Sequence, residues 1–343
     1  MAKVKISEIT EKVKTIFMRE GVDEATAEIV TASLVESDMK GVWTHGTLRV
    51  PLYVTCLRSG GVRPTGDIEI INDSPTMARV NGKGGLGIAI AHNATKLAIE
   101  KAKATGVGIV SIMGSHHFGA AGTFASMCAD EGMIGLSMSN TGAMIAPTGA
   151  CVKGIGNNPF SYAVPAGKSG TVLYDIAISM GSDMKIIAMQ KTGEKLPDGW
   201  LIDREGKPTN DPNEYRNGAV LAPFGGYKGY GLALMVEFFA AVLSGGGITF
   251  ESVAWNKDPS KENGGNVGQF VMAIDISRLM DKDEFIARAE SLIDKMKSCD
   301  KAVGVDEIYY PGEKEKLAKE AALASGYVEI KDDTLAAIDE LLK

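Results

Sequence analysis

Strand-like and helix-like segments alternate through the middle of the chain, from about residue 67 to residue 311. Short apolar, β-branched runs are separated by longer runs with helical periodicity, and glycine and proline are frequent in the connections. This alternation is typical of a sheet covered by helices and predicts a mixed α/β fold. The expected strands are 68–71, 76–80, 107–113, 134–139, 160–164, 172–178 and 270–274, and the expected helices are 88–104, 121–131, 230–244 and 282–297.

Both ends of the chain are expected to be helical. Apolar residues from 9 to 17 fall on one face of a helix that Ser7 can cap, and Asp23 can cap a second helix. The tail is also expected to be helical and to pack back onto these helices. We therefore expect a helical domain of residues 1–66, completed by 312–343, and a mixed α/β domain of residues 67–311, in which the polar stretch 254–268 is an exposed loop.

Composition and charge exclude several classes of protein. The formal net charge is -7, which is a poor match to a phosphate backbone, so no nucleic-acid partner is expected. The longest apolar run, near residues 232–243, is interrupted by Glu237 and is too short to span a bilayer. The start of the chain lacks the apolar stretch of a signal peptide. The 4 cysteines are far apart and are expected to be buried thiols in a reducing cytosol, which predicts a cytoplasmic protein without membrane contact.

A glycine-rich segment, residues 82–87, matches the GxGxxG pattern of dinucleotide-binding folds. That fingerprint also needs an acidic residue about twenty positions later, which holds the ribose hydroxyls. Residues 107–112 read VGIVSI and contain no carboxylate, and the preceding strand carries Arg79. The segment is therefore interpreted as a glycine-rich turn into a helix rather than as a Rossmann site.

Histidine offers the first candidates for acid–base chemistry. His116 and His117 follow the expected strand 107–113 and precede a glycine-containing segment, a position where α/β proteins place reactive groups. Adjacent side chains on extended backbone point in opposite directions, so only one of the two is expected in a shared site. The alternative is one capping and one packing histidine. His92 lies inside an expected helix and is expected to pack or to face solvent.

His45 and Arg49 form a candidate carboxylate site. If their segment is helical, the spacing of four residues puts both side chains on one face. A guanidinium group can bind a carboxylate in two places, and an imidazole can hydrogen-bond a neighbouring oxygen. The alternative is a solvated arginine beside a capping histidine.

A second glycine-rich segment, residues 225–231, contains Lys228 and leads into an apolar helix. Backbone N–H groups at such a helix start, together with a lysine, form an anion site that suits a cofactor phosphate. A plain glycine-rich turn is the alternative. The chain has no HExxH or HxxxH motif and no Cys/His cluster with ligand spacing, so no metal centre is expected.

Four segments taken together resemble the malate/L-lactate dehydrogenase family, a non-Rossmann group that also holds sulfolactate, ureidoglycolate and 2,3-diketogulonate oxidoreductases. The matching segments run in order along almost the whole chain, so the resemblance is more specific than any single motif. They are residues 37–49 with SDMKG and THG, SHHFGAAG at 115–122, GIGNNP at 154–159, and 223–231 with Lys228; LPDGW at 196–200 and PGE at 311–313 fit as well.

The resemblance implies a homodimer with a non-Rossmann fold, in which a helical N-terminal domain precedes a mixed-sheet domain that binds the cofactor. It implies that His117 is the catalytic acid/base and also touches the cofactor. His45 and Arg49 would be the other catalytic residues, and together with Thr44 and Tyr53 they would bind the substrate. The remaining cofactor contacts are implied at Thr141, Asp175, Ile176, Ala177, Lys228, Pro311 and Gly312.

Two positions depart from the family's usual pattern. Thr44 stands where the family commonly has serine, which keeps the hydroxyl but narrows the pocket. His116 stands where the family often has asparagine or serine, and this neighbour can alter the pKa of His117.

The resulting prediction is an NAD(P)-dependent oxidoreductase that transfers a hydride between the cofactor and C2 of a small 2-hydroxy or 2-keto acid of the malate or lactate type. His117 would protonate the carbonyl oxygen in reduction and accept the hydroxyl proton in oxidation. The particular acid stays open, as does the choice between NAD, slightly preferred, and NADP. Two alternatives remain: an NAD(P)H-dependent reductase of cyclic imino acids, and a non-catalytic nucleotide-binding sensor, which would leave His117 unexplained.

Overall fold

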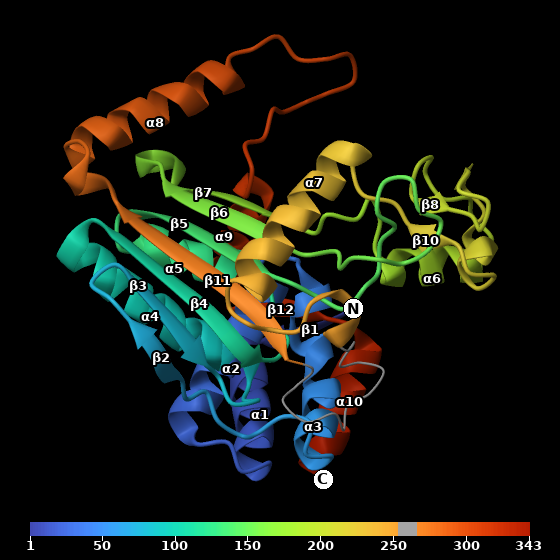
Figure 1. The fold of residues 1–343 in the computed structure, drawn as a ribbon, viewed down its shortest axis with the longest axis horizontal. Coiled ribbons are helices and arrows are strands. Elements are labelled where there is room, and N and C mark those ends of the chain that lie inside the picture. Colours follow the sequence, from blue (N-terminus) through green and yellow to red (C-terminus); the bar gives the residue numbers. More distant parts are fainter. Residues whose placement is uncertain (253–265) are drawn as a thin grey trace.

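A computed structural model of the chain describes residues 1–252 and 266–343. Its largest sheet has seven strands: β2 (Glu69–Asp73), β3 (Met77–Asn81), β4 (Val107–Ser115), β5 (Met133–Ser139), β6 (Phe160–Pro165), β7 (Thr171–Ile176) and β11 (Val267–Asp275). They lie in the order β2-β3-β4-β11-β5-β6-β7 (Figure 1). Every neighbouring pair in this sheet is antiparallel except β3–β4. Rossmann folds use a mostly parallel sheet, so the predicted non-Rossmann mixed α/β class is confirmed.

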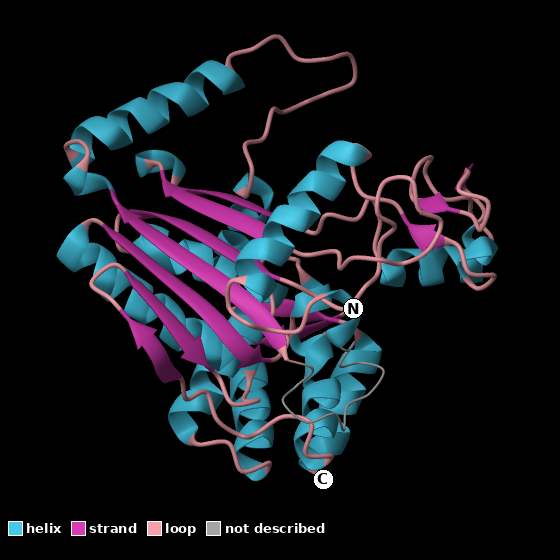
Figure 2. Cartoon of the chain, viewed as in Figure 1, coloured by secondary structure: helices cyan, strands magenta, loops and turns pink. Residues whose placement is uncertain are grey.

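Helices cover both faces of this sheet. Helices α4 (Gly87–Thr105) and α5 (Ala121–Asp130) pack on one face, and α7 (Tyr227–Val236) lies across the other, where it continues into a π-helical turn, Glu237–Val242 (Figures 1 and 2). Side chains on β4 alternate accordingly. Val110 and Ile112 join the apolar cluster under α4, whereas Ile109 joins the cluster under α7.

The N-terminal and C-terminal segments pack together at one end of the molecule. A single apolar cluster joins side chains of the first 90 residues to Val328, Ile330 and Ile338. Strand β1 pairs with β12 in a separate antiparallel sheet. The division into a domain of residues 1–66 with 312–343 and a domain of residues 67–311 remains a prediction. The elements of these two terminal segments are β1 (Ala2–Lys5), α1 (Ile6–Arg19), α2 (Glu24–Met39), α3 (Val50–Arg58), α9 (Glu313–Ser325), β12 (Tyr327–Ile330) and α10 (Asp332–Leu342).

Several expectations for these terminal segments need correction. Ser7 is not the N-cap of α1, because the helix already begins at Ile6, whose N–H donates to the Gly326 carbonyl at 3.0 Å. Asp23 is confirmed as the cap of α2, since its carboxylate accepts from the Thr26 N–H at 3.0 Å. The tail is not helical throughout, because it contains β12.

Helix α8 (Lys282–Lys297) is present as predicted. Other elements of the chain were not predicted. They are α6 (Asp183–Thr192) and a small sheet of β8 (Leu201–Ile202), β9 (Pro208–Thr209) and β10 (Val220–Leu221).

Of the cysteines, Cys56 and Cys128 are buried, but Cys151 is half-buried and Cys299 is exposed, so the expectation of four buried thiols is wrong. Residues 254–265 of the expected loop 254–268 lie outside the described residues, and residues 267 and 268 belong to β11 instead of a loop. None of the described helices has the length and apolar character needed to cross a membrane.

Candidate active site

The candidate site begins where β4 ends. His116 and His117 follow Ser115, the last residue of β4, and the His116 carbonyl accepts a hydrogen bond of 2.9 Å from the side-chain amide of Gln269 on β11. A Cβ atom at Gly87, the first residue of α4, would overlap the backbone carbonyls of both histidines. The last glycine of the GxGxxG segment therefore allows α4 to begin against the histidine-bearing backbone, in agreement with its interpretation as a turn into a helix.

His117 is held through its Nδ1 atom. The hydroxyl of Tyr53, on α3, lies 2.6 Å from Nδ1, and the Gly119 N–H donates to the same nitrogen at 3.3 Å. A backbone N–H can only donate, so Nδ1 is an acceptor in this arrangement and the proton of the neutral ring is on Nε2. The Tyr53 side chain is buried, and burial raises the pKa of its hydroxyl, which keeps it protonated.

A second histidine and an arginine lie beside His117. The His45 ring stacks on the His117 ring at 5.7 Å between centroids and 18° between planes. Burial and the Arg49 guanidinium lower the pKa of His45 to about 4. Burial, followed by Arg49 and His45, lowers the pKa of His117 well below its usual value. Both imidazoles are therefore neutral at pH 7 in this structure, and the arginine is the positive group that an anion would meet.

Two 3-10 turns, Trp43–His45 and Thr47–Arg49, carry this part of the site. The continuous helix that would place His45 and Arg49 on one face is absent, because Gly46 between the turns is extended (φ -91°, ψ -152°). The two side chains nevertheless come together, since the Arg49 Nε–H donates to the Thr44 carbonyl at 2.6 Å and the Thr44 hydroxyl lies 3.0 Å from Nδ1 of His45.

Asp38, near the end of α2, fixes the junction between the two turns. Its buried carboxylate accepts from the N–H and the hydroxyl of Thr47, at 2.9 and 2.6 Å. A Cβ atom at Gly46 would overlap this carboxylate, which explains the glycine there. Burial raises the pKa of Asp38 to about 6, and the two Thr47 hydrogen bonds oppose that rise.

The predicted cofactor residues Asp175, Pro311 and Gly312 lie together around a pocket of about 420 Å³. The Asp175 carboxylate accepts from the Gly122 N–H, in the first turn of α5, at 2.7 Å, and burial raises its pKa to about 6. The Pro311 carbonyl accepts from the N–H of Leu173 on β7 at 3.0 Å. The pocket is lined by Ser37, Lys40, Val42, Ala120, Gly122, Thr123, Leu173, Tyr174, Asp175, Tyr309, Tyr310, Pro311, Gly312, Lys314 and Glu315.

A series of hydrogen bonds joins the other predicted cofactor segments. The Thr141 hydroxyl donates to the Asn157 side-chain oxygen at 3.1 Å, and the Asn157 carbonyl accepts from the Ile178 N–H at 2.7 Å. The Ile178 carbonyl then accepts from the Phe224 N–H at 2.9 Å. Ile178 follows β7, which ends at Ile176, and Phe224 precedes α7. Thr141, the Ile176–Ala177 segment and the entrance to α7 are therefore neighbours in the structure.

Lys228 lies in the first turn of α7 and is exposed. Among the described residues, its side chain has no hydrogen-bond or ion-pair partner, and it does not line the pocket around Asp175. The geometry thus places Lys228 on the segment that continues from Phe224 but not in contact with the other predicted cofactor residues.

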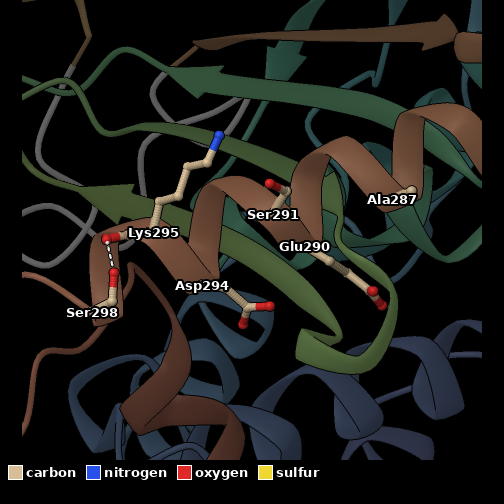
Figure 3. Close-up of a pocket in the computed structure, with 6 residues that line it drawn as sticks. All are labelled: Ala287, Glu290, Ser291, Asp294, Lys295 and Ser298. Atoms are coloured by element: carbon tan, nitrogen blue, oxygen red, sulfur yellow. Dashed lines mark hydrogen bonds between the residues drawn. The ribbon is translucent and has the colours of Figure 1, made fainter.

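Another hollow, of about 470 Å³, follows one face of α8 (Figure 3). None of the predicted site residues lines it. Two of its carboxylates are already engaged, since Glu290 accepts from the Lys168 N–H at 2.7 Å and Asp294 pairs with the Lys168 ammonium at 2.9 Å. Its lining residues are Ala287, Glu290, Ser291, Asp294, Lys295 and Ser298. In the described part of the chain, no group of three or more His, Cys, Asp or Glu side chains is arranged to hold a metal ion.

Sequence reasoning missed two side chains of the site. Asp38 and Lys40 both lie in the SDMKG segment that carried the resemblance, but their roles were not predicted. Lys40 lines the pocket beside Asp175, and its ammonium lies 3.0 Å from the Glu36 carboxylate. The signal available in the sequence was an acid, Asp38, and a cation, Lys40, close to the end of an expected helix and shortly before His45.

Comparison with known proteins identifies the family. The family model described as malate/L-lactate dehydrogenase matches residues 4–339. The chain belongs to this family. A malate dehydrogenase of Pyrococcus horikoshii is 39% identical over 332 residues, which cover 94% of this chain and 90% of the relative.

Two further proteins similar to this chain have other activities. The solved structure of a sulfolactate dehydrogenase from Methanocaldococcus jannaschii has a TM-score of 0.92 and 32% identity, and covers 99% of this chain and 96% of its own. A Delta(1)-pyrroline-2-carboxylate/Delta(1)-piperideine-2-carboxylate reductase of Pseudomonas putida is 30% identical over 342 residues, 100% of this chain and 97% of the relative. Family membership confirms the predicted fold and the predicted enzyme class, an NAD(P)-dependent oxidoreductase of small hydroxy acids.

Proposed function

We propose that this protein interconverts a small 2-hydroxy acid and its 2-keto acid, with His117 as the acid/base. The observation that carries the proposal is the group formed by His117, Tyr53, His45 and Arg49 at the end of β4. One imidazole is held through Nδ1 by a tyrosine and lies beside a second imidazole, whose pKa is lowered by burial and by the neighbouring guanidinium. A proton-transfer group and a carboxylate-binding group are thereby in one place.

Arg49 and His45 bind the substrate carboxylate, and Thr44 and Tyr53 complete the pocket. A planar guanidinium can grip a carboxylate with two parallel hydrogen bonds, and the neutral His45 can donate one more to the acid. Arg49 is half-buried, and this burial lowers its pKa. Burial also removes water that would screen the guanidinium charge, so an arriving carboxylate gains more here than it would at the surface.

Substrate binding also prepares His117 for proton donation. After burial, the positive charge of Arg49 is the next cause of the lowered pKa of His117. A bound carboxylate offsets that charge, so the pKa of His117 rises toward the working pH when substrate is present. Nδ1 is held by Tyr53 and Gly119, so we assign the proton exchange with the substrate oxygen to Nε2. In oxidation, the same nitrogen takes the hydroxyl proton when the ring is in its other tautomer, in which the ring proton is on Nδ1 and is donated to the Tyr53 oxygen.

The residues around Asp175 suit a nicotinamide dinucleotide. The pocket offers a carboxylate that can accept from ribose hydroxyls, a cation at Lys40 for phosphate, and the tyrosine rings 309 and 310 as flat surfaces. Thr141, Ile176 and Ala177 extend the site along the hydrogen-bonded series described above, and Lys228 lies in the first turn of the helix that follows Phe224. When bound, the cofactor supplies or accepts the hydride at C2 of the substrate.

The first experiment follows the absorbance of the reduced nicotinamide band. Purified protein is mixed with NADH or NADPH and with oxaloacetate, pyruvate, sulfopyruvate, glyoxylate or 2,3-diketogulonate. We expect oxidation with at least one acid, and the same panel decides between the two cofactors. Cofactor binding without turnover of any 2-keto acid would overturn the assignment of substrate class.

A second candidate function is the reduction of cyclic imino acids. It is favoured by the 30% identity to the Pseudomonas putida reductase, whose substrates carry a carboxylate beside a C=N bond. The same Arg49 and His117 serve this chemistry, since the imine also needs a carboxylate site and a proton. Turnover of piperideine-2-carboxylate or pyrroline-2-carboxylate, without turnover of 2-keto acids, would establish it.

We further propose that the protein is a cytoplasmic homodimer. An apolar strip along α7 and the turn that follows it is exposed in the single chain, and such strips commonly mark protein interfaces. Its larger members are Leu234, Phe238, Phe239, Val242 and Leu243. The described cysteines form no disulfide, in agreement with a reducing compartment. Light scattering of the purified protein tests the dimer, and a monomeric mass would contradict it.

A further inference from the structure

A buried carboxylate outside the proposed mechanism lies at the start of the π-helical turn. Glu237 is 4% exposed and follows directly after α7. Its Oε1 accepts from the Thr249 N–H at 2.7 Å and lies 3.4 Å from the Asn140 amide nitrogen, and its Oε2 accepts from the Asn158 amide at 2.7 Å. No lysine, arginine or histidine of the described chain forms an ion pair with it. Each of these three contacts, all with described residues, comes from an N–H group, so both carboxylate oxygens act as acceptors.

One of these donors belongs to the GIGNNP segment, residues 154–159, to which neither the substrate site nor the proton transfer assigns a task. Asn158 is fully buried and lies in the left-handed region at φ 29°, a conformation that needs support from its surroundings. Its amide donates to Glu237 and to the Ala233 carbonyl of α7, while its side-chain oxygen accepts from the Thr141 N–H at 3.0 Å. Asn158 therefore connects Glu237 directly to a proposed cofactor residue.

The connection continues into the rest of the proposed cofactor site. The Thr141 hydroxyl donates to the side-chain oxygen of Asn157 and accepts from the backbone N–H of the same residue. The Asn157 carbonyl accepts from the N–H of Ile178, in the segment that follows β7. On the other side, Glu237 closes α7, the helix whose first turn carries Lys228. Glu237 thus links the segment that contains Thr141 to the end of the helix that carries Lys228, two parts of the site that were predicted separately.

We infer that Glu237 is a positioning residue for the nicotinamide cofactor. Through Asn158 it fixes Thr141 and the GIGNNP segment in the geometry that binds the cofactor, and it makes no contact with the 2-keto acid. This inference rests on the proposed function, because the place of the cofactor at Thr141 is itself part of that proposal.

The substitution that tests it is Glu237→Gln. Glutamine has the same shape, but one of its two terminal groups is a donor, so it faces an N–H of Asn158, Asn140 or Thr249 instead of accepting from it. Coupling through such a network changes affinity by about 0.5–2 kcal/mol, so the dissociation constant of the cofactor should rise about 2- to 30-fold. The KM for the 2-keto acid at saturating cofactor should stay within about twofold of the original value.

A matched control is Asp275→Asn. Asp275 is also a buried carboxylate with backbone and hydroxyl donors, but it lies at the far end of β11, where it accepts from the N–H and hydroxyl of Ser277 at 3.0 and 2.8 Å. Fluorescence titration with NADH and NADPH, together with thermal unfolding, is carried out on both variants and the original protein. Asp275→Asn should lower the melting temperature without changing the cofactor dissociation constant.

Asn158→Asp and its combination with Glu237→Gln make the test independent of folding defects in a single protein. Asn158→Asp alone places a second carboxylate against Glu237 and should weaken cofactor binding. In the double variant, the new amide at position 237 can donate to the new carboxylate at position 158, so part of the affinity should return.

Two results would decide against the inference or against its basis. If Glu237→Gln lowers the melting temperature but leaves the cofactor dissociation constant unchanged, Glu237 is structural only and the inference is wrong. If the original protein binds neither NADH nor NADPH, the proposed function fails before this inference is reached.

Discussion

Removal of the Tyr53 hydroxyl tests how His117 is prepared for proton transfer. The hydroxyl is both donor and acceptor, so it can serve either tautomer of His117, whereas the Gly119 N–H can only donate to Nδ1. Without Tyr53, the remaining partner favours the tautomer with the proton on Nε2. That tautomer cannot accept the hydroxyl proton of the substrate at Nε2. We therefore expect Tyr53→Phe to slow oxidation of the 2-hydroxy acid.

The size of the effect follows from the geometry. The contact is short, 2.6 Å, and the Tyr53 side chain is only 2% exposed, so water does not replace the lost group. When His117 becomes positive, Nδ1–H donates to the Tyr53 oxygen, and a hydrogen bond to a charged group contributes about 1.5–3 kcal/mol. At about 1.36 kcal/mol per factor of ten, kcat should fall about 10- to 150-fold.

The assay is kcat at saturating 2-hydroxy acid and oxidised cofactor, with thermal unfolding measured alongside. Phenylalanine keeps the ring in its place, 6.4 Å from the Phe17 ring, so the fold should be retained. Tyr215→Phe is the control, because that hydroxyl also hydrogen-bonds a side chain, the Asp183 carboxylate at 2.7 Å, but lies outside the site. A kcat for Tyr53→Phe within about twofold of the original would refute the reasoning.

Three further predictions concern the substrate side. Arg49→Lys keeps the charge but loses the planar fork, so the KM for the acid should rise by about tenfold or more while cofactor affinity stays constant; unchanged kinetics would remove Arg49 from the site. Burial, Arg49 and His45 lower the pKa of His117, so its protonated form is a minor one that becomes still rarer as pH rises. We therefore expect kcat/KM for reduction to fall with increasing pH, whereas kcat/KM for oxidation should not fall. Parallel pH profiles in the two directions would contradict this. Asp38→Ala leaves two buried Thr47 donors unsatisfied and should lower the free energy of unfolding in urea by about 1–3 kcal/mol, with a smaller loss for Asp38→Asn; full stability of the alanine variant would disprove the role of Asp38 at Gly46.

Local patterns predicted the individual elements well. The periodicity placed α8 at Lys282–Lys297 and α5 within one residue of its observed end, and each predicted strand of the large sheet is present. These elements bury one face or one stripe, so their apolar spacing carries the information. The position of β11 between β4 and β5 could not be predicted, because a strand at residues 267–275 and its partners more than 120 residues earlier share no local signal.

The smaller elements show the limits more clearly. Strands β1 and β12 have only four residues each and are stabilised by pairing with each other across the length of the chain, so Ser7 looked like a helix start when the helix already begins at Ile6. Strands β8, β9 and β10 have two residues each, which is too short for alternation to be recognised.

The site itself was predicted by resemblance more than by spacing. Spacing of four residues suggested that His45 and Arg49 share a helix face, but Gly46 breaks the helix and the side chains meet through the Thr44 carbonyl instead. Tyr53, which lies 64 positions before His117, reaches Nδ1 only because the fold brings α3 beside the residues that follow β4. The roles of Asp38 and Glu237 depend on contacts with Thr47 and Asn158 that no linear pattern encodes.

The most direct test of the account compares His117→Ala with the original protein in reduction of the 2-keto acid. Cofactor affinity is measured by fluorescence titration and the hydride-transfer step by single-turnover absorbance. General acid catalysis is worth about 10²–10⁴-fold, so the account predicts a loss of that size in turnover while the variant still binds the cofactor. Turnover within a few-fold of the original, in a folded His117→Ala variant that binds the cofactor, would contradict the central claim that His117 transfers the proton.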